Sequence, residues 1–180
     1  MNLADSSQVI RHPCIIKFKL ISISKKMSSA KLSFLTIDFI RHLNNLDENT
    51  PAQWGKMNVV QMIEHMSDSV RIANGKDPHQ IITTEEKLKP MKDFLMSEKD
   101  FRPNTPNSLM SETPAPIRNK SKEDAIRELQ KELNDFVNHF KMNVDARIKN
   151  PFFGELNFEE WVQLLHKHSI HHLRQFGADV

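Results

Sequence analysis

The chain of 180 residues is poor in cysteine, glycine and tyrosine. Cys14 is the single cysteine, so an internal disulfide and a Cys-x-x-Cys metal site are both excluded. Four glycines and no tyrosine argue against a β-sandwich or β-barrel, because the many turns of those folds require glycine. The length suits about one domain, with a core large enough to be stable without disulfides.

Long apolar runs are also missing. No run approaches the roughly 18 residues that a membrane span requires. The best candidate near the N-terminus, residues 14–24, is interrupted by Lys17 and Lys19, which argues against a secretory signal. We therefore expect a cytoplasmic protein without a membrane partner.

Charge is unevenly distributed along the chain, although the net charge is only +2. Residues 1–31 contain six basic residues and one acidic residue, so the remainder has a net charge of −3. A slightly acidic body offers no surface for nucleic acid, and we expect no such partner. We predict that residues 1–30 are a basic, poorly ordered extension, with a partner-binding arm as the alternative, and that residues 31–180 form the domain.

From Leu32 onward, apolar residues recur at helical spacing. The N-caps expected for the later helices are Asn58, Ser121 and Asn157, the last with Glu160 at the third helical position. The expected long helices cover residues 32–43, 58–73, 121–140 and 157–176, with a shorter helix at 84–96, a Pro-rich loop at 97–119 and a turn region at 149–156. Four long amphipathic helices predict an all-α four-helix bundle with a short extra helix and a long Pro-rich loop. Residues 14–24 alternate like a strand but have no second strand to pair with.

The last predicted helix contains His166, His168, His171 and His172. On a helical wheel of about 100° per residue, His172 and His168 lie about 20° and 60° from the centre of the apolar face, and the other two lie about 100° or more away. His168 and His172 are spaced i, i+4, which stacks their rings one turn apart, as for two ligands of one metal. The alternative interpretation is a pair of hydrogen-bonded core or interface histidines.

A tetrahedral site needs a third protein ligand. His65 lies at the border of the apolar face of helix 58–73 and can reach the interior from across the bundle. His139 lies off the apolar stripe of its helix, His79 lies in a loop, and His42 lies near the end of the first helix. From spacing alone, the favoured interpretation of His65 is a boundary residue that binds water.

Two segments resemble the DinB-like (DinB/YfiT) superfamily of metalloenzymes. They are the helix that follows Trp54-Gly-Lys-Met and includes His65, and the closing pattern His168-x-x-x-His172-x-x-Gln175. Together with residues 151–156, they look like one uncharacterised DinB-related bacterial family. The resemblance covers about residues 32–178. It implies a four-helix bundle with a metal held by His65, His168 and His172, and, since many relatives are dimers, a homodimer.

Three neutral imidazoles leave a divalent metal its full charge and at least one open coordination position. The ligand type suits Zn, Ni or Fe. Such a metal activates either a low-molecular-weight thiol, as in a transferase, or water, as in a hydrolase, toward a small-molecule substrate. Relatives include thiol-dependent transferases and isomerases. The alternative is a non-catalytic dimeric helical scaffold or a metal-binding interaction protein.

Several polar and aromatic residues lie near these histidines in the sequence. Glu64, Asp68, Glu160 and Gln175 are interpreted as solvated surface residues rather than partners of the ligand rings. Trp54 and Trp161 are interpreted as core residues, with pocket lining as the alternative. The Pro-rich loop is expected to be either a lid over the open position or disordered.

Overall fold

The computed structural model describes residues 28–105, 109, 111 and 113–180. The strand-like segment 14–24, most of the extension 1–30 and five positions of the Pro-rich loop lie outside the described residues. The division into an extension and a domain therefore stays a prediction.

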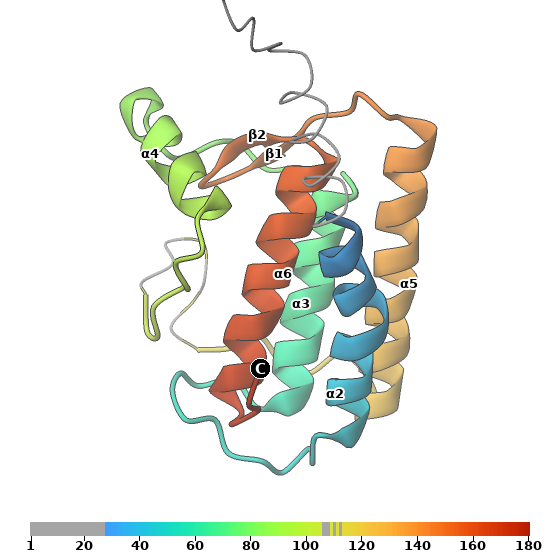
Figure 1. Ribbon diagram of the computed structural model, residues 1–180. Coiled ribbons are helices and arrows are strands. Elements are labelled where there is room, and N and C mark those ends of the chain that lie inside the picture. Colours follow the sequence, from blue (N-terminus) through green and yellow to red (C-terminus); the bar gives the residue numbers. More distant parts are fainter. Residues whose placement is uncertain (1–27, 106–108, 110, 112) are drawn as a thin grey trace, which may run out of the picture.

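The long helices form a four-helix bundle, which confirms the predicted all-α fold (Figure 1). Residues 28–33 are α-helical and continue through a π-helical turn into the next helix. The bundle elements are η1 (Phe34–Asp38), α2 (Phe39–Asn45), α3 (Val59–Ala73), α5 (Lys122–Met142) and α6 (Phe158–Gln175). The chain descends along α2 in Figure 1, ascends along α3 and α5, and descends along α6. The neighbouring helices α3 and α6 are consequently antiparallel.

Apolar stripes from all four sides meet in one core. Completely buried members include Phe39, Met62, Ile63, Leu129, Phe136, Trp161 and Leu165. Trp161 is a core residue, as expected, and its Nε1–H donates to the carbonyl of Ile148 at 3.3 Å. At roughly 25 cal/mol per Å² of apolar area, burial of these side chains supplies the main force that holds the helices together.

The predicted N-caps are present. Asn58 and Asn157 each form a capping box, with Gln61 and Glu160 at the third helical position, and Ser121 accepts a hydrogen bond from the backbone N–H of Asp124. Each cap satisfies N–H groups that the first helical turn leaves without partners. Glu160 is thus a capping residue, also paired with Lys92 at 3.1 Å, and not a partner of a histidine ring.

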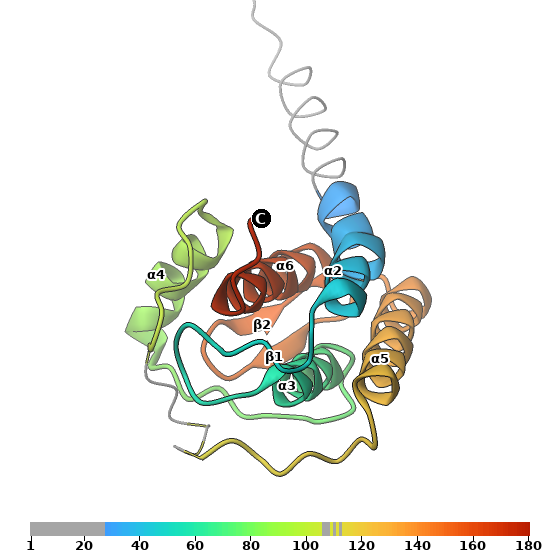
Figure 2. The same cartoon turned by 90° about the horizontal axis from the view of Figure 1, so that it is seen from below.

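Two smaller elements lie outside the bundle. Helix α4 (Glu85–Met96) packs against the outer side of α6 (Figure 2). The segment expected to be a turn is a hairpin of β1 (Ile148–Asn150) and β2 (Gly154–Leu156), so that expectation was incomplete. The Asn150 side chain accepts from the backbone N–H groups of Phe152 and Phe153 and thereby closes the hairpin. Strands of three residues are too short to show an alternating pattern.

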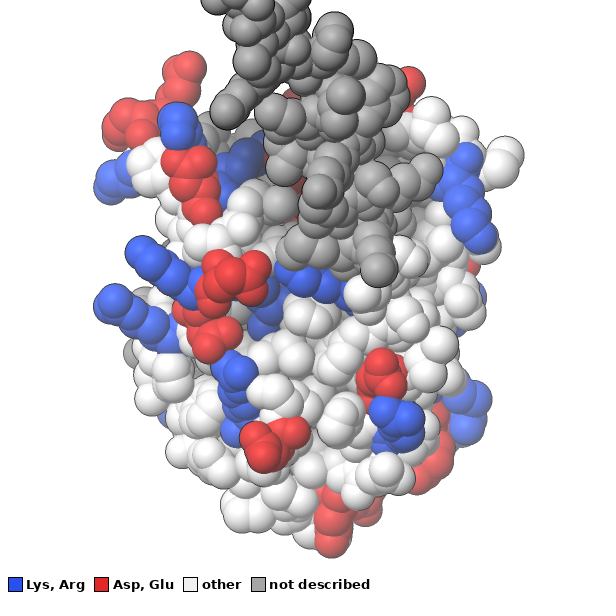
Figure 3. Space-filling view, in the orientation of Figure 1, with Lys and Arg blue, Asp and Glu red and all other residues white. Residues whose placement is uncertain are grey.

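Charged side chains of both signs are interspersed on the face shown in Figure 3, where no large area of one sign is visible. Within the described part of the chain, no helix combines the length and the apolar character needed to cross a membrane.

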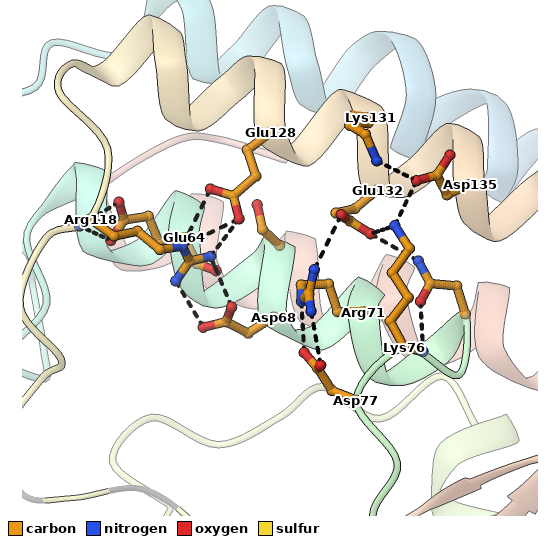
Figure 4. A network of polar contacts seen from close by, with 12 residues as sticks. Glu64, Asp68, Arg71, Lys76, Asp77, Arg118, Glu128, Lys131, Glu132 and Asp135 are labelled. Atoms are coloured by element: carbon orange, nitrogen blue, oxygen red, sulfur yellow. Dashed lines mark hydrogen bonds and ion pairs between the residues drawn. The ribbon is translucent and has the colours of Figure 1, made fainter.

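The end of the Pro-rich loop is fixed to α3 by a polar network (Figure 4). The carboxylate of Glu64 accepts hydrogen bonds from the backbone N–H groups of Arg118 at 3.0 Å and Asn119 at 2.7 Å, and from the Asn119 side chain at 2.9 Å. The Arg118 guanidinium pairs with Asp68 at 2.8 Å and with Glu128 at 2.9 Å. Glu64 is only 3% exposed, so its interpretation as a surface residue was wrong.

We expect Glu64→Leu to lower the free energy of unfolding by about 1–3 kcal/mol, because three partly buried N–H donor groups lose their charged acceptor. Urea denaturation measures this change. Glu64→Gln is the matched control, since it keeps one acceptor oxygen and should cost less. A Leu variant as stable as the parent protein would contradict the anchoring role.

Candidate metal centre

The structure brings together the three histidines singled out in the sequence. His65 comes from α3, and His168 and His172 come from the last two turns of the antiparallel α6. One ring nitrogen from each lies within 4.8 Å of the other two. The Nε2 atom of His168 lies 3.1 Å from that of His65 and 2.9 Å from that of His172.

These separations are suited to one small cation. With Zn–N bonds of 2.0–2.1 Å, two nitrogen ligands of a tetrahedral ion lie about 3.3 Å apart. The observed separations of 2.9 and 3.1 Å are slightly shorter, so small ring movements would bring both to that value. The three residues therefore fit a single divalent metal.

Gln175 determines which nitrogen of His172 carries the proton. The Gln175 amide donates to the carbonyl of Trp54 at 2.7 Å, which identifies its Oε1 as the acceptor toward His172. The Nδ1–H of His172 then donates to this oxygen at 2.8 Å. In the neutral ring, Nε2 is consequently unprotonated and directs its lone pair at the cluster, as a metal ligand must.

A network of ordinary hydrogen bonds satisfies this cluster poorly. The Nε2 atom of His168 takes part in both short contacts, but it has either one proton or one lone pair. It cannot make a separate hydrogen bond to each neighbour. A cation accepts all three lone pairs at once, so the arrangement favours a metal site over a hydrogen-bonded core.

Burial keeps the three rings neutral. It lowers the pKa of His65 to about 4, with a smaller contribution from the charge of His171. Burial, followed by the charges of the neighbouring histidines, also holds the pKa values of His168 and His172 well below their usual range. The rings are therefore in the ligand-competent form at neutral pH, without prior loss of a proton.

The Trp54–Gly55 turn supports this arrangement from outside the bundle. Gln175 is 2% exposed and connects this turn to His172, so its interpretation as a surface residue was wrong. Gly55 has a φ of +75°, and a Cβ atom there would lie 2.8 Å from the Gln175 amide nitrogen. Both the backbone conformation and the close approach require glycine.

The other histidines considered as ligands lie outside the cluster. His42 and His166 both contact the ring of Phe34, with centroids 6.4 and 5.0 Å away. His139 contacts Phe140 at 5.3 Å, and His171 contacts Trp54 at 5.6 Å. Among the described residues, the group that could hold a metal consists of His65, His168 and His172. It includes neither these four histidines nor His79.

Sequence reasoning missed two residues beside the cluster. The ring centroid of Phe101, in the first part of the Pro-rich loop, lies 6.4 Å from that of His168 and 6.2 Å from that of His171. Lys167 is 9% exposed, and its Nζ donates to the carbonyls of Phe94, Leu95 and Ser97 at 2.9–3.3 Å. Lys167 thereby caps the end of α4 and fixes the start of the loop.

Comparison with known proteins gives one family match, which covers most of the chain. A protein-family model described as the DinB superfamily matches residues 36–176, a range that includes His65, His168, His172 and Gln175. Neither the curated proteins nor the solved structures give a match.

The lowered histidine pKa values predict a pH dependence of stability in the metal-free protein. Between the ordinary pKa of 6.5 and about 4, the unfolded chain binds more protons than the folded chain. We therefore expect the free energy of unfolding to be constant above about pH 7 and to fall as the pH is lowered from 7 to 5. Urea denaturation in EDTA at several pH values measures this effect.

The same titration with saturating zinc is the control. Zinc that binds only the folded chain raises the free energy of unfolding at each pH, and because it keeps protons off the folded histidines, the decline from pH 7 to pH 5 should be as steep or steeper. Equal stability of the metal-free protein at pH 7 and pH 5 would contradict neutral, buried rings.

Proposed function

The chain belongs to the DinB superfamily, and on this premise we propose that it is a metal-dependent enzyme whose divalent ion is held by His65, His168 and His172. The convergence of three neutral imidazoles from two helices is the observation that supports this proposal. The orientation of His172 by Gln175 supports it further, because a carbonyl partner on the second ring nitrogen is typical of metal-bound histidine.

A zinc, nickel or iron ion at this site would act as a Lewis acid that lowers the pKa of a coordinated thiol or water. The three histidines add no negative charge that would weaken this effect. Phe101 contacts the ring of His168 edge-on from the side of the loop. His171 and Lys167 extend the wall of the site toward α4.

The proposed reaction is transfer to or from a small thiol, with hydrolysis as the alternative. The superfamily resemblance favours the thiol, whereas general metal chemistry supports either. The proposal includes a small-molecule substrate, a homodimeric assembly and a cytoplasmic location. Assays of zinc-loaded protein on electrophilic substrates with thiols, and on esters without thiols, distinguish transferase from hydrolase. Absence of metal binding would leave the non-catalytic scaffold.

We expect purified protein, after reconstitution with zinc, to retain about one equivalent of metal. His65→Ala, His168→Ala and His172→Ala should each lose most of it, since removal of one ligand leaves only two. Elemental analysis after gel filtration measures retention, and circular dichroism checks that helicity persists. His166→Ala is the matched control on the same helix and should retain metal. Retention in all three ligand variants would refute the assignment.

Gln175→Leu should weaken zinc binding about 10- to 100-fold, because the His172 ring loses the acceptor that orients it. Competition with a chromophoric chelator measures the affinity. Gln163→Leu is the control, since Gln163 is also buried on α6 but donates to the carbonyl of Leu95 instead. Equal affinities of the two variants would contradict the orienting role.

A further inference from the structure

The ring of His168 has the central position in the histidine cluster. Its Nε2 atom makes both short contacts, at 3.1 Å to the Nε2 of His65 and at 2.9 Å to that of His172. A rotation of this one ring would therefore separate the three nitrogens that the proposed metal needs. Residues of a binding site keep such a geometry when packing and hydrogen bonds from their neighbours fix their rotamers.

His168 lacks the kind of partner that His172 has. The Nδ1–H of His172 donates to Gln175 at 2.8 Å, which fixes the orientation of that ring. Within the described part of the chain, the hydrogen-bonding contacts of the His168 ring all involve Nε2, so no protein group fixes this ring through Nδ1. Packing must therefore supply for His168 the orientation that a hydrogen bond supplies for His172.

Phe101 is placed to provide this packing. Among the described residues, three aromatic rings contact the ring of His168, and two of them belong to the proposed ligands His65 and His172. The third is Phe101, whose centroid lies 6.4 Å from that of His168 with the two rings at 86°. This edge-on arrangement is a favoured geometry of aromatic pairs.

The ring of Phe101 is itself held from several sides. Its centroid lies 5.7 Å from that of Phe94 at the end of α4 and 6.4 Å from that of Phe153 in the hairpin. The ammonium group of Lys167 lies 4.5 Å from the centroid of Phe94 and 5.8 Å from that of Phe101, within the range of cation–π contacts. Phe101 thus belongs to a small aromatic group that joins α4, the hairpin and α6.

Two cationic side chains of α6 fix the backbone segment that carries Phe101. Lys167 donates to the carbonyl of Ser97 at 2.9 Å, and Arg174 pairs with Asp100 at 2.8 Å. The neighbours of Phe101 in the chain are exposed on both sides, whereas Phe101 is half-buried. One side chain of an otherwise solvent-facing loop therefore reaches the histidine cluster, and α6 holds that loop in place.

We propose that Phe101 is a positioning residue of the metal centre, which holds the ring of His168 so that its Nε2 meets those of His65 and His172. The inference rests on the proposed function, because it concerns a ligand of the proposed metal. Lys167 and Arg174 act one step further away, since they hold the segment that carries Phe101.

Competition for zinc with a chromophoric chelator tests this proposal on the full chain. Phe101→Ala should weaken zinc binding about tenfold or more, as expected for the loss of a residue that orients a metal ligand. Phe101→Tyr keeps the ring and should bind zinc as tightly as the parent protein. Phe101 lines part of a cavity of about 200 Å³, which leaves room for the added hydroxyl group.

Phe152→Ala is the matched control. Phe152 is also half-buried and packs against the core, but it has no ring contact with a histidine among the described residues. Both alanine variants should lower the stability of the metal-free protein to urea, and only Phe101→Ala should lower the zinc affinity. Circular dichroism checks the fold of each variant. Phe101→Leu, which keeps apolar volume without the flat ring, provides the same comparison if Phe101→Ala does not fold.

Cobalt(II) in place of zinc provides a spectroscopic readout, because its visible absorption depends on the coordination geometry. We expect the spectrum to change in Phe101→Ala and to stay the same in Phe101→Tyr and Phe152→Ala. A change confined to Phe101→Ala would separate the position of a ligand ring from a general loss of stability.

The outcomes separate this proposal from the proposed function. A parent protein that binds zinc, with unchanged affinity and an unchanged cobalt spectrum in Phe101→Ala, would overturn the positioning role and leave the metal-dependent function standing. Equal losses of affinity in Phe101→Ala and Phe152→Ala would also overturn the positioning role, because general destabilisation would then explain both. A parent protein that retains no zinc after reconstitution would overturn both proposals.

Discussion

The site depends on the antiparallel contact between α3 and α6. This contact places one imidazole from α3 opposite two from α6, with His172 buried and His65 and His168 partly buried. Rings buried in this way remain neutral, and at least one of them is held with its lone pair toward the others. In the absence of a cation, such a cluster contributes little to stability, because its two short contacts compete for a single nitrogen of His168.

Both helices are held in place by polar contacts that lie outside the core. On α3, the residue before His65 is Glu64, which accepts hydrogen bonds from the backbone N–H groups of Arg118 and Asn119. On α6, Gln175 lies one turn after His172 and binds the Trp54–Gly55 turn. The end of the Pro-rich loop and the segment before α3 are thereby connected to residues adjacent to the proposed ligands. The same hydrogen bonds therefore hold these segments in the fold and support the residues of the site.

Much of this arrangement could be predicted from local patterns. Apolar periodicity located the long helices, and Asn58 and Asn157 marked their starts, because caps act within one turn. The helical wheel separated His168 and His172 from His166 and His171, because the direction of a side chain from a helix also depends only on local geometry. His65 required the superfamily resemblance, since a residue at the border of an apolar face faces either water or a partner helix.

Residues whose role depends on distant partners could not be predicted in this way. Gln175 and Glu64 are polar, and only their tertiary hydrogen bonds explain their burial. Lys167 lies on the side of α6 opposite the main core, where the sequence gives no sign that α4 covers it. The hairpin was missed because its strands are short and its turn is stabilised by the side chain of Asn150.

X-ray absorption at the zinc edge of the reconstituted protein tests the central claim most directly, because it counts the imidazoles on the metal. We expect three nitrogen ligands at about 2.0–2.1 Å with the multiple scattering of imidazole, plus light-atom coordination from solvent. A spectrum fitted by one imidazole or none would contradict a metal held by His65, His168 and His172. A spectrum that is unchanged in the His168→Ala variant would contradict it as well.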